Sequence, residues 1–143
     1  MITKVPFPHG MIPEFLNRDV YEKLRTTWPD EKDFIQMSAG SYNKLSLSER
    51  FGAPKYYEFL SAYPQWKAAY KYFKSTAFRE DILFRLGIPL PEECTSRFEF
   101  SSMPAQGGFI RPHRDIKTKI VTVVLPMTDV EEPAGTDIYL PKQ

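Results

Sequence analysis

The stretch RPHRDIKTKIVTVVLP, residues 111–126, decides the fold, because it places a His-x-Asp pair just before a long β-branched run. On a β-strand, side chains at positions i and i+2 project to the same face. We therefore expect His113 and Asp115 to direct an imidazole nitrogen and a carboxylate oxygen at one point. The run KIVTVVLPM at 119–127 is typical of a strand that is buried on both faces.

The letters His-Arg-Asp also begin the catalytic loop of protein kinases, which is a competing interpretation of the same stretch. That loop requires an asparagine five residues after its aspartate, and position 120 is isoleucine. The phosphate-covering glycine-rich loop, the strand lysine and the Asp-Phe-Gly motif of a kinase are missing as well. The sequence thus excludes a kinase and leaves two interpretations of His-x-Asp, a metal site or an ordinary pair of surface residues.

Composition narrows the class of protein further. At 143 residues the chain is expected to form a single domain, and 19 basic against 18 acidic residues give no global field that would favour nucleic acid or an anionic membrane. No run approaches the roughly 18 apolar residues of a membrane span, and a single cysteine, Cys94, rules out an internal disulfide. We expect a cytoplasmic protein with no nucleic-acid or membrane partner.

Residues 1–90 are expected to be a mainly helical support region. A first helix is predicted after Asn17, a suitable N-cap, with Leu16, Val20 and Leu24 on its apolar stripe and Pro29 beyond its end. Residues 30–54 are expected to be rich in loops because glycine and proline punctuate them.

Two further helical segments are predicted before residue 90. KYYEFLSAY at 55–63 indicates a short helix. Residues 64–87 carry the strongest helical pattern, with an aromatic stripe typical of core packing, a break near Ser75 and a stop at Gly87.

The sequence pattern changes from helical to strand-like at Thr95. Alternation in SRFEFSSM puts Phe98 and Phe100 on one face of a half-buried strand. Further strands are predicted in GGFIRPHRD at 107–115, at 119–127, and in GTDIYLPK at 135–142. The fold class expected for residues 1–143 is α+β, with the strands of 95–143 following the helices.

Three stretches of this second part, RFEFSSMPAQGGFIRPHRD, KTKIVTVVLPM and AGTDIYLPK, together resemble the Fe(II)/2-oxoglutarate-dependent dioxygenases of the prolyl-4-hydroxylase-like branch. The opening VPFPHGMIPEFLNRDVYEKLRTTWP is similar to the start of that branch. The resemblance implies N-terminal helices packed on a partial double-stranded β-helix, a jelly-roll or cupin-like sheet. It also implies an oxidoreductase that hydroxylates a substrate by means of Fe(II) and 2-oxoglutarate.

The resemblance assigns roles to five residues. His113 and Asp115 match the first two ligands of the 2-His-1-carboxylate triad, and no catalytic residue is expected beyond the metal ligands. Thr122 and Lys119 fall where the family contacts 2-oxoglutarate, and the alternative for Thr122 is an ordinary buried strand residue. Arg111 could face a substrate or a surface carboxylate.

The chain departs from the family in one respect. The family places a distal histidine and a basic residue on later strands, whereas nothing after Asp115 is His or Arg and the other histidine is His9. We expect a fragment or incomplete frame that holds metal weakly and self-associates, as a homo-oligomer, through an open sheet edge or face. A partner's His9 could complete the site.

The alternative is a non-catalytic binding or assembly module that retains half of the fold. The substrate would be a peptide or a small molecule, and the sequence carries no recognisable motif that identifies it.

Overall fold

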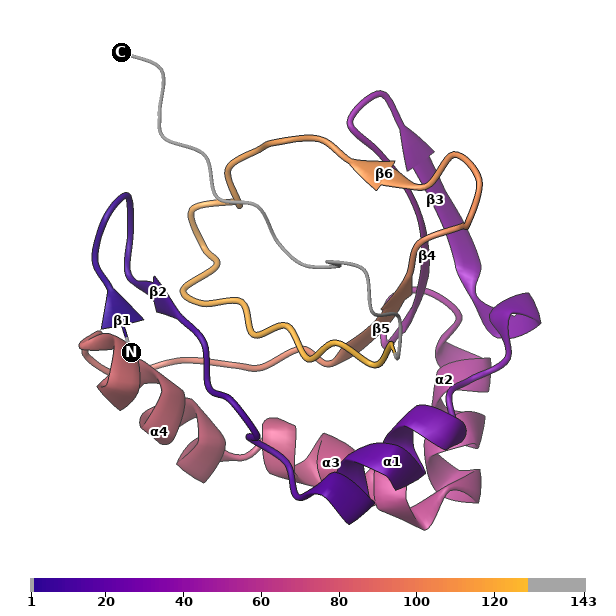
Figure 1. Cartoon of the computed structure of the whole chain (residues 1–143), viewed down its shortest axis with the longest axis horizontal. Helices are drawn as coiled ribbons and strands as arrows, with labels where there is room; N and C mark the ends of the chain where they lie inside the picture. The colour runs from indigo at the N-terminus through magenta and orange to yellow at the C-terminus, as the bar shows by residue number, and fades with distance from the viewer. Residues whose placement is uncertain (1, 129–143) are drawn as a thin grey trace.

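The computed structural model describes residues 2–128, which form a mixed α+β structure with two antiparallel sheets (Figure 1). The α+β class is confirmed, whereas the double-stranded β-helix expected from the resemblance is not. The larger sheet has the order β3-β4-β5, with β6 also paired to β4. In chain order the elements are β1 (Ile2–Thr3), β2 (His9–Gly10), α1 (Arg18–Thr26), the 3-10 turn η1 (Glu31–Asp33), β3 (Ile35–Ala39), β4 (Tyr42–Ser48), α2 (Ala53–Ala62), α3 (Pro64–Phe73), α4 (Thr76–Leu86), β5 (Glu99–Ser102) and β6 (Phe109–Ile110).

The predicted helix boundaries are confirmed by the caps that form them. The Asn17 side chain accepts a hydrogen bond from the Asp19 amide at 2.8 Å, which begins α1. Ser75 interrupts the long pattern because its hydroxyl caps α4, and Gly87 ends α4 in a left-handed conformation. The predicted apolar stripe of α1 is wrong at one position, because Val20 is exposed.

Among residues 2–128, no helix has the length and apolar character needed to cross a membrane.

The prediction that residues 30–54 are rich in loops is wrong. Residues 35–48 form a β-hairpin in which Ala39 pairs with Tyr42, so that Gly40 and Ser41 make a two-residue turn. The sequence of β3 alternates apolar and polar residues, and so does 45–48 in β4, so the strand pattern was present in the sequence. The prediction gave more weight to the glycines and the proline in this stretch than to that alternation.

The prediction of a buried strand at 119–125 is also wrong. These residues form no strand, most of their side chains are exposed, and the one backbone hydrogen bond here between described residues runs from Lys119 to Ile116. The physical reason is that no described segment pairs with this run, and a strand requires the backbone groups of a neighbour. The predicted strand at 135–142 lies outside the described residues.

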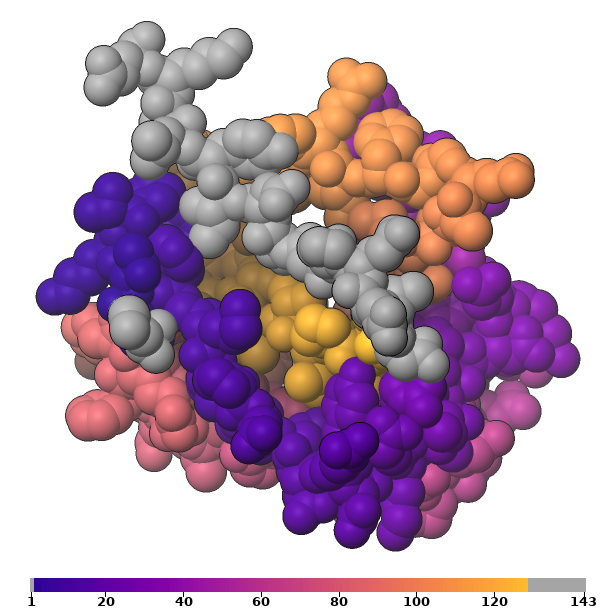
Figure 2. All heavy atoms as spheres, in the orientation of Figure 1, coloured from indigo at the N-terminus to yellow at the C-terminus, as the bar shows by residue number. Residues whose placement is uncertain are grey.

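The end of this segment is nevertheless anchored to the rest of the fold. Met127 packs against the hydrophobic core, and the Tyr21 hydroxyl of α1 donates to the Pro126 carbonyl at 3.1 Å. In Figure 2 the yellow end of the described chain lies in the middle of the visible face, bordered below by the indigo and purple atoms of the N-terminal part. The segment thus crosses the molecule without belonging to a sheet.

The hydrophobic core is an aromatic cluster centred on Phe100 of β5, which is only 2% exposed. Its ring lies 4.9 Å from the ring of Trp66 on α3 and 5.5 Å from that of Phe59 on α2, measured between centroids. Edge-to-face contacts of this kind add to the hydrophobic gain of burial. The Trp66 indole also donates to the Thr27 carbonyl at 3.1 Å, which ties α3 to the end of α1. Helices and sheet therefore share one core.

We expect Phe100→Ala to lower the free energy of unfolding by about 3–5 kcal/mol, because it leaves a cavity where several rings converge. Urea denaturation followed by tryptophan fluorescence measures the change. Phe84→Ala is the matched control, since Phe84 is 83% exposed and its loss should cost less than about 0.5 kcal/mol. Equal losses in the two variants would show that Phe100 is not the centre of the core.

A half-buried ion pair connects the end of β4 to α3. Lys74 binds the Glu49 carboxylate, and the Tyr70 hydroxyl donates to the same oxygen at 3.1 Å. The Lys74 hydrogen bond lowers the pKa of Glu49 more than burial raises it. Burial lowers the pKa of Lys74, but its hydrogen bonds to Glu49 and Tyr70 together raise that pKa above the ordinary value.

This ion pair predicts a pH-dependent stability. A carboxyl group whose pKa is depressed in the folded state contributes stability that is present above its unfolded value of 4.5 and is lost as pH falls through the lower folded value. We expect Lys74→Gln to lower the free energy of unfolding by about 1 kcal/mol at pH 7 and by progressively less below pH 4.5. Urea titrations between pH 7 and pH 3 measure this, with the exposed Lys67→Gln as control. A deficit that stays constant over this range would contradict the assignment.

Candidate metal centre after strand β6

Strand β6 is fixed against the hairpin by contacts from distant parts of the chain. Phe109 pairs with Asn43 of β4, and the Asn43 amide donates to the Gly107 carbonyl at 2.8 Å. The Arg111 amide then donates to the Ser41 carbonyl in the hairpin turn at 2.8 Å. The chain therefore leaves β6 at a defined place, beside the Gly40-Ser41 turn.

Two glycines allow this approach to β6. Gly107 has φ +74°, a left-handed conformation that side chains strain. A Cβ at Gly108 would lie 2.5 Å from the Pro104 carbonyl oxygen, so this position has no room for a side chain. The Gly107-Gly108 pair thus allows the connection between β5 and β6 to pack closely against the Pro104 backbone.

His113 lies beyond the end of β6, so the prediction that it stands on a strand is wrong. All residues from Arg111 to Ile120 are exposed and irregular, because the strand ends at Ile110. The imidazole Nδ1 lies 2.8 Å from the Arg111 carbonyl oxygen, and a carbonyl can only accept, so Nδ1 is the donor. In the neutral ring this leaves the lone pair on Nε2, which faces Asp115.

The convergence of the two side chains does not depend on a strand. His113 Nε2 and Asp115 Oδ1 are 3.3 Å apart, with about half of each side chain exposed. The orientation of the ring comes from a local turn, because His9 makes the same contact from Nδ1 to the Phe7 carbonyl at 2.8 Å, also in an X-Pro-His sequence. What distinguishes His113 is the carboxylate two residues further on.

The Asp115 carboxylate is the centre of the cluster. The Lys119 ammonium lies 3.5 Å from Oδ1, and the Thr122 hydroxyl donates to Oδ2 at 3.3 Å. Four of the five residues singled out in the sequence therefore meet at one carboxylate. Thr122 is exposed, so the alternative that it is a buried strand residue is wrong.

Arg111 takes a different place from the other four. Its guanidinium lies over the Phe109 ring, 5.7 Å from the centroid, and its backbone binds Ser41 and His113. The structure thus shows a role for the Arg111 backbone in positioning the loop, and its side chain stands outside the Asp115 cluster.

The spacing of the two donor atoms can be compared with the needs of a metal ion. Two donors that are each about 2.1 Å from an ion lie about 3.0 Å apart at a right angle and about 3.4 Å apart at a tetrahedral angle. The observed 3.3 Å falls within that range. A metal-binding histidine usually donates its other nitrogen to a carbonyl or carboxylate, as His113 does here. The pair therefore fits two positions of a coordination sphere.

A complete protein coordination sphere is not found in residues 2–128. Within that part of the chain, no group of three or more His, Cys, Asp or Glu side chains is close enough to hold one ion. The Lys119 ammonium group is the positive charge that lies next to Asp115. A metal ion that binds here has to compete with this ammonium group.

Sequence reasoning missed the residues that position the site. Asn43 and Ser41 lie more than 60 residues before the loop they hold, and Tyr21 lies more than 100 residues before Pro126. No local pattern marks a polar side chain as the partner of a distant carbonyl group. Only the Gly107-Gly108 pair gave a signal in the sequence.

Comparison with protein-family models finds no matching family, and comparisons with curated proteins and with solved structures find no match either.

We expect Gly108→Ala to displace β6, because the new methyl group would collide with the Pro104 backbone. Overpacking of this kind should lower the free energy of unfolding by about 1–3 kcal/mol. NMR spectra should also show shifts of the Arg111 and His113 amide signals. Gly40→Ala is the control, since a Cβ at Gly40 meets nothing within 4 Å. If both alanines left the Arg111 amide signal unmoved, the close approach at Gly108 would not position the loop.

Proposed function

We propose that the chain is a 2-oxoglutarate/Fe(II)-dependent oxygenase-like protein in which His113 and Asp115 are two of the metal ligands. The observation that carries the proposal is the 3.3 Å separation of Nε2 and Oδ1, with the imidazole held by its other nitrogen. The resemblance to the dioxygenases supports it, because it assigns the ligand roles to these same two residues.

The chemistry would be divided between the cofactors and the protein. When bound, Fe(II) with 2-oxoglutarate and O₂ supplies the oxidation of an unreactive C–H bond of the substrate. The chain's own residues would set the charge and orientation around the ion. Asp115 contributes the negative charge, His113 a fixed lone pair, and Lys119 and Thr122 an ammonium and a hydroxyl beside that carboxylate.

The proposal includes weak metal binding by His113 and Asp115 alone. Affinity at imidazole and carboxylate sites grows with the number of ligands and with an ordered surrounding shell. The sequence offers no histidine after Asp115 for a third position and no arginine for the far carboxylate of 2-oxoglutarate. A ligand from a second copy of the chain, such as His9, would be one way to complete the sphere.

A non-catalytic assembly module is the second candidate function, and one observation favours it. Ile120, Val123 and Val124 are 42%, 49% and 63% exposed on a segment with no strand partner among residues 2–128. Apolar side chains next to unpaired backbone groups favour association with another chain. Under this alternative the segment would mediate homo-oligomerisation, and the His113–Asp115 pair would be an ordinary surface ion pair.

Calorimetric titration with Mn(II), with and without 2-oxoglutarate, separates the two functions. We expect saturable binding that 2-oxoglutarate tightens, and we expect His113→Ala and Asp115→Ala each to weaken it at least about tenfold. Asp81→Ala is the matched control, because it removes an exposed carboxylate that pairs with Arg85 on α4, outside the Asp115 cluster. Binding that survives in the His113→Ala variant, or no binding at all, would refute the oxygenase proposal and favour the assembly module.

A further inference from the structure

A second polar site lies at the opposite end of β4 from β6. The antiparallel ladder between β4 and β5 ends with Ser48 opposite Glu99. Arg50 and Arg97 each lie two residues beyond this end of the ladder, and both line the same pocket. The fold therefore places two guanidinium groups at the wall of one pocket.

The turn that presents Arg50 is held in place by its own hydrogen bonds. The Ser48 hydroxyl accepts from the amides of Arg50 and Phe51, both at 3.2 Å, and the Ser48 amide donates to the Phe51 carbonyl at 2.8 Å. Gly52 follows with φ +77°, a conformation suited to glycine. The position of Arg50 is thus set by the backbone of the turn and does not depend on an ion pair.

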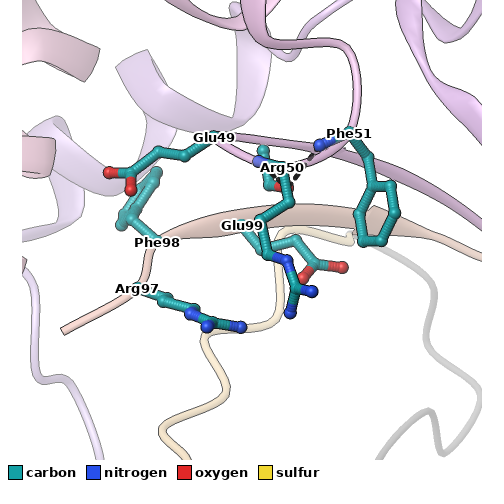
Figure 3. Close-up of a pocket in the computed structure, with 7 residues that line it drawn as sticks. Glu49, Arg50, Phe51, Arg97, Phe98 and Glu99 are labelled. Atoms are coloured by element: carbon teal, nitrogen blue, oxygen red, sulfur yellow. Dashed lines mark hydrogen bonds between the residues drawn. The ribbon is translucent and has the colours of Figure 1, made fainter.

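Neither arginine has a carboxylate partner among residues 2–128. No carboxylate oxygen in that range lies within 4.0 Å of either guanidinium, and Arg50 instead stands 5.8 Å from the centroid of the Phe51 ring. Figure 3 shows both guanidinium groups extending to the same side of the two strands. Neither guanidinium is therefore neutralised by a direct ion pair, and the Arg97 charge acts on Glu49 only over a longer distance, where it helps to lower the pKa of that carboxyl group.

Two acidic residues do line the same pocket, but other groups neutralise them. Glu99 accepts from Ser46 at 2.7 Å and from Ser101 at 3.0 Å, and it pairs with Lys44 at 3.4 Å. Glu49 points away from the arginines in Figure 3 and binds Lys74. Each carboxylate is thus matched by one lysine, and the charges of Arg50 and Arg97 remain in excess.

The two arginines border a hollow of about 360 Å³, part of which is open to solvent. The walls also include the Phe51 and Phe98 side chains. We propose that this pocket binds a phosphoryl group of a small molecule. A phosphate monoester carries a charge of about −1.5 to −2 at pH 7, which matches two guanidinium groups, whereas one carboxylate would leave a positive charge unbalanced. Arginine also binds phosphate oxygens in a bidentate manner.

The phosphoryl site is independent of the proposed metal centre. None of the residues that line the pocket belongs to the Asp115 cluster, and β6 pairs with the other end of β4, at Tyr42 and Asn43. Seven strand residues separate the two ends, a length of about 20 Å. Failure of metal binding would leave this inference intact, and failure of phosphate binding would leave the metal proposal intact.

The test is calorimetric titration of the full chain with inorganic phosphate at constant ionic strength in chloride. We expect saturable binding, with Arg50→Gln and Arg97→Gln each raising the dissociation constant at least about tenfold. Arg85→Gln is the control, because it removes the same charge from an exposed pair with Asp81 on α4. Succinate, a dicarboxylate, is titrated in parallel and should bind more weakly than phosphate.

Thermal unfolding gives a second readout that tests folding and binding together. With phosphate, the native chain should gain stability while the Arg97→Gln variant gains little. Equal weakening of phosphate binding in all three variants, or no saturable binding, would overturn the proposal. Tighter binding of succinate would overturn the phosphoryl class of ligand.

Discussion

The ring of Phe100 lies among side chains from three separate parts of the chain, and its burial fixes the register of the sheet. Phe100 stands opposite Leu47 of β4, and both are almost wholly inaccessible to solvent. A shift of one residue would turn Glu99 into the aromatic core and Phe100 outward, because neighbouring strand residues face opposite ways. Such a shift would bury the Glu99 carboxylate in place of the Phe100 ring, which is strongly unfavourable.

Because its register is fixed in this way, β4 positions both polar sites, one at each of its ends. Its first residues hold β6 and, through Asn43 and the adjoining turn, the loop that carries His113 and Asp115. Its last residue, Ser48, holds the turn that carries Arg50 to the wall of the pocket that Arg97 also lines. The same strand pairs with β3 and β5 along its length. A disturbance of the core around Leu47 and Phe100 would therefore reach both ends of the strand.

Patterns within a few residues predicted the elements that depend on local interactions. Asn17, Ser75 and Gly87 cap helices by contacts with their near neighbours, so their sequence signals were sufficient. Strand β3 and the segment 119–125 depend on partners instead. The first is mostly exposed but has β4 beside it, and the second is rich in β-branched residues but has no described partner. Pairing, and not composition, decided which of the two became a strand.

By itself, the sequence determined the helix ends, the alternation that buries Phe100, and the Pro-His-Arg-Asp order that brings an imidazole close to a carboxylate. These features result from interactions between residues close together in the chain. Only the tertiary structure decided that Lys119 and Thr122 meet that carboxylate from an irregular loop, and that Arg50 and Arg97 line one pocket. The physical reason is that such encounters depend on loop closure and strand register, which the burial of distant side chains sets.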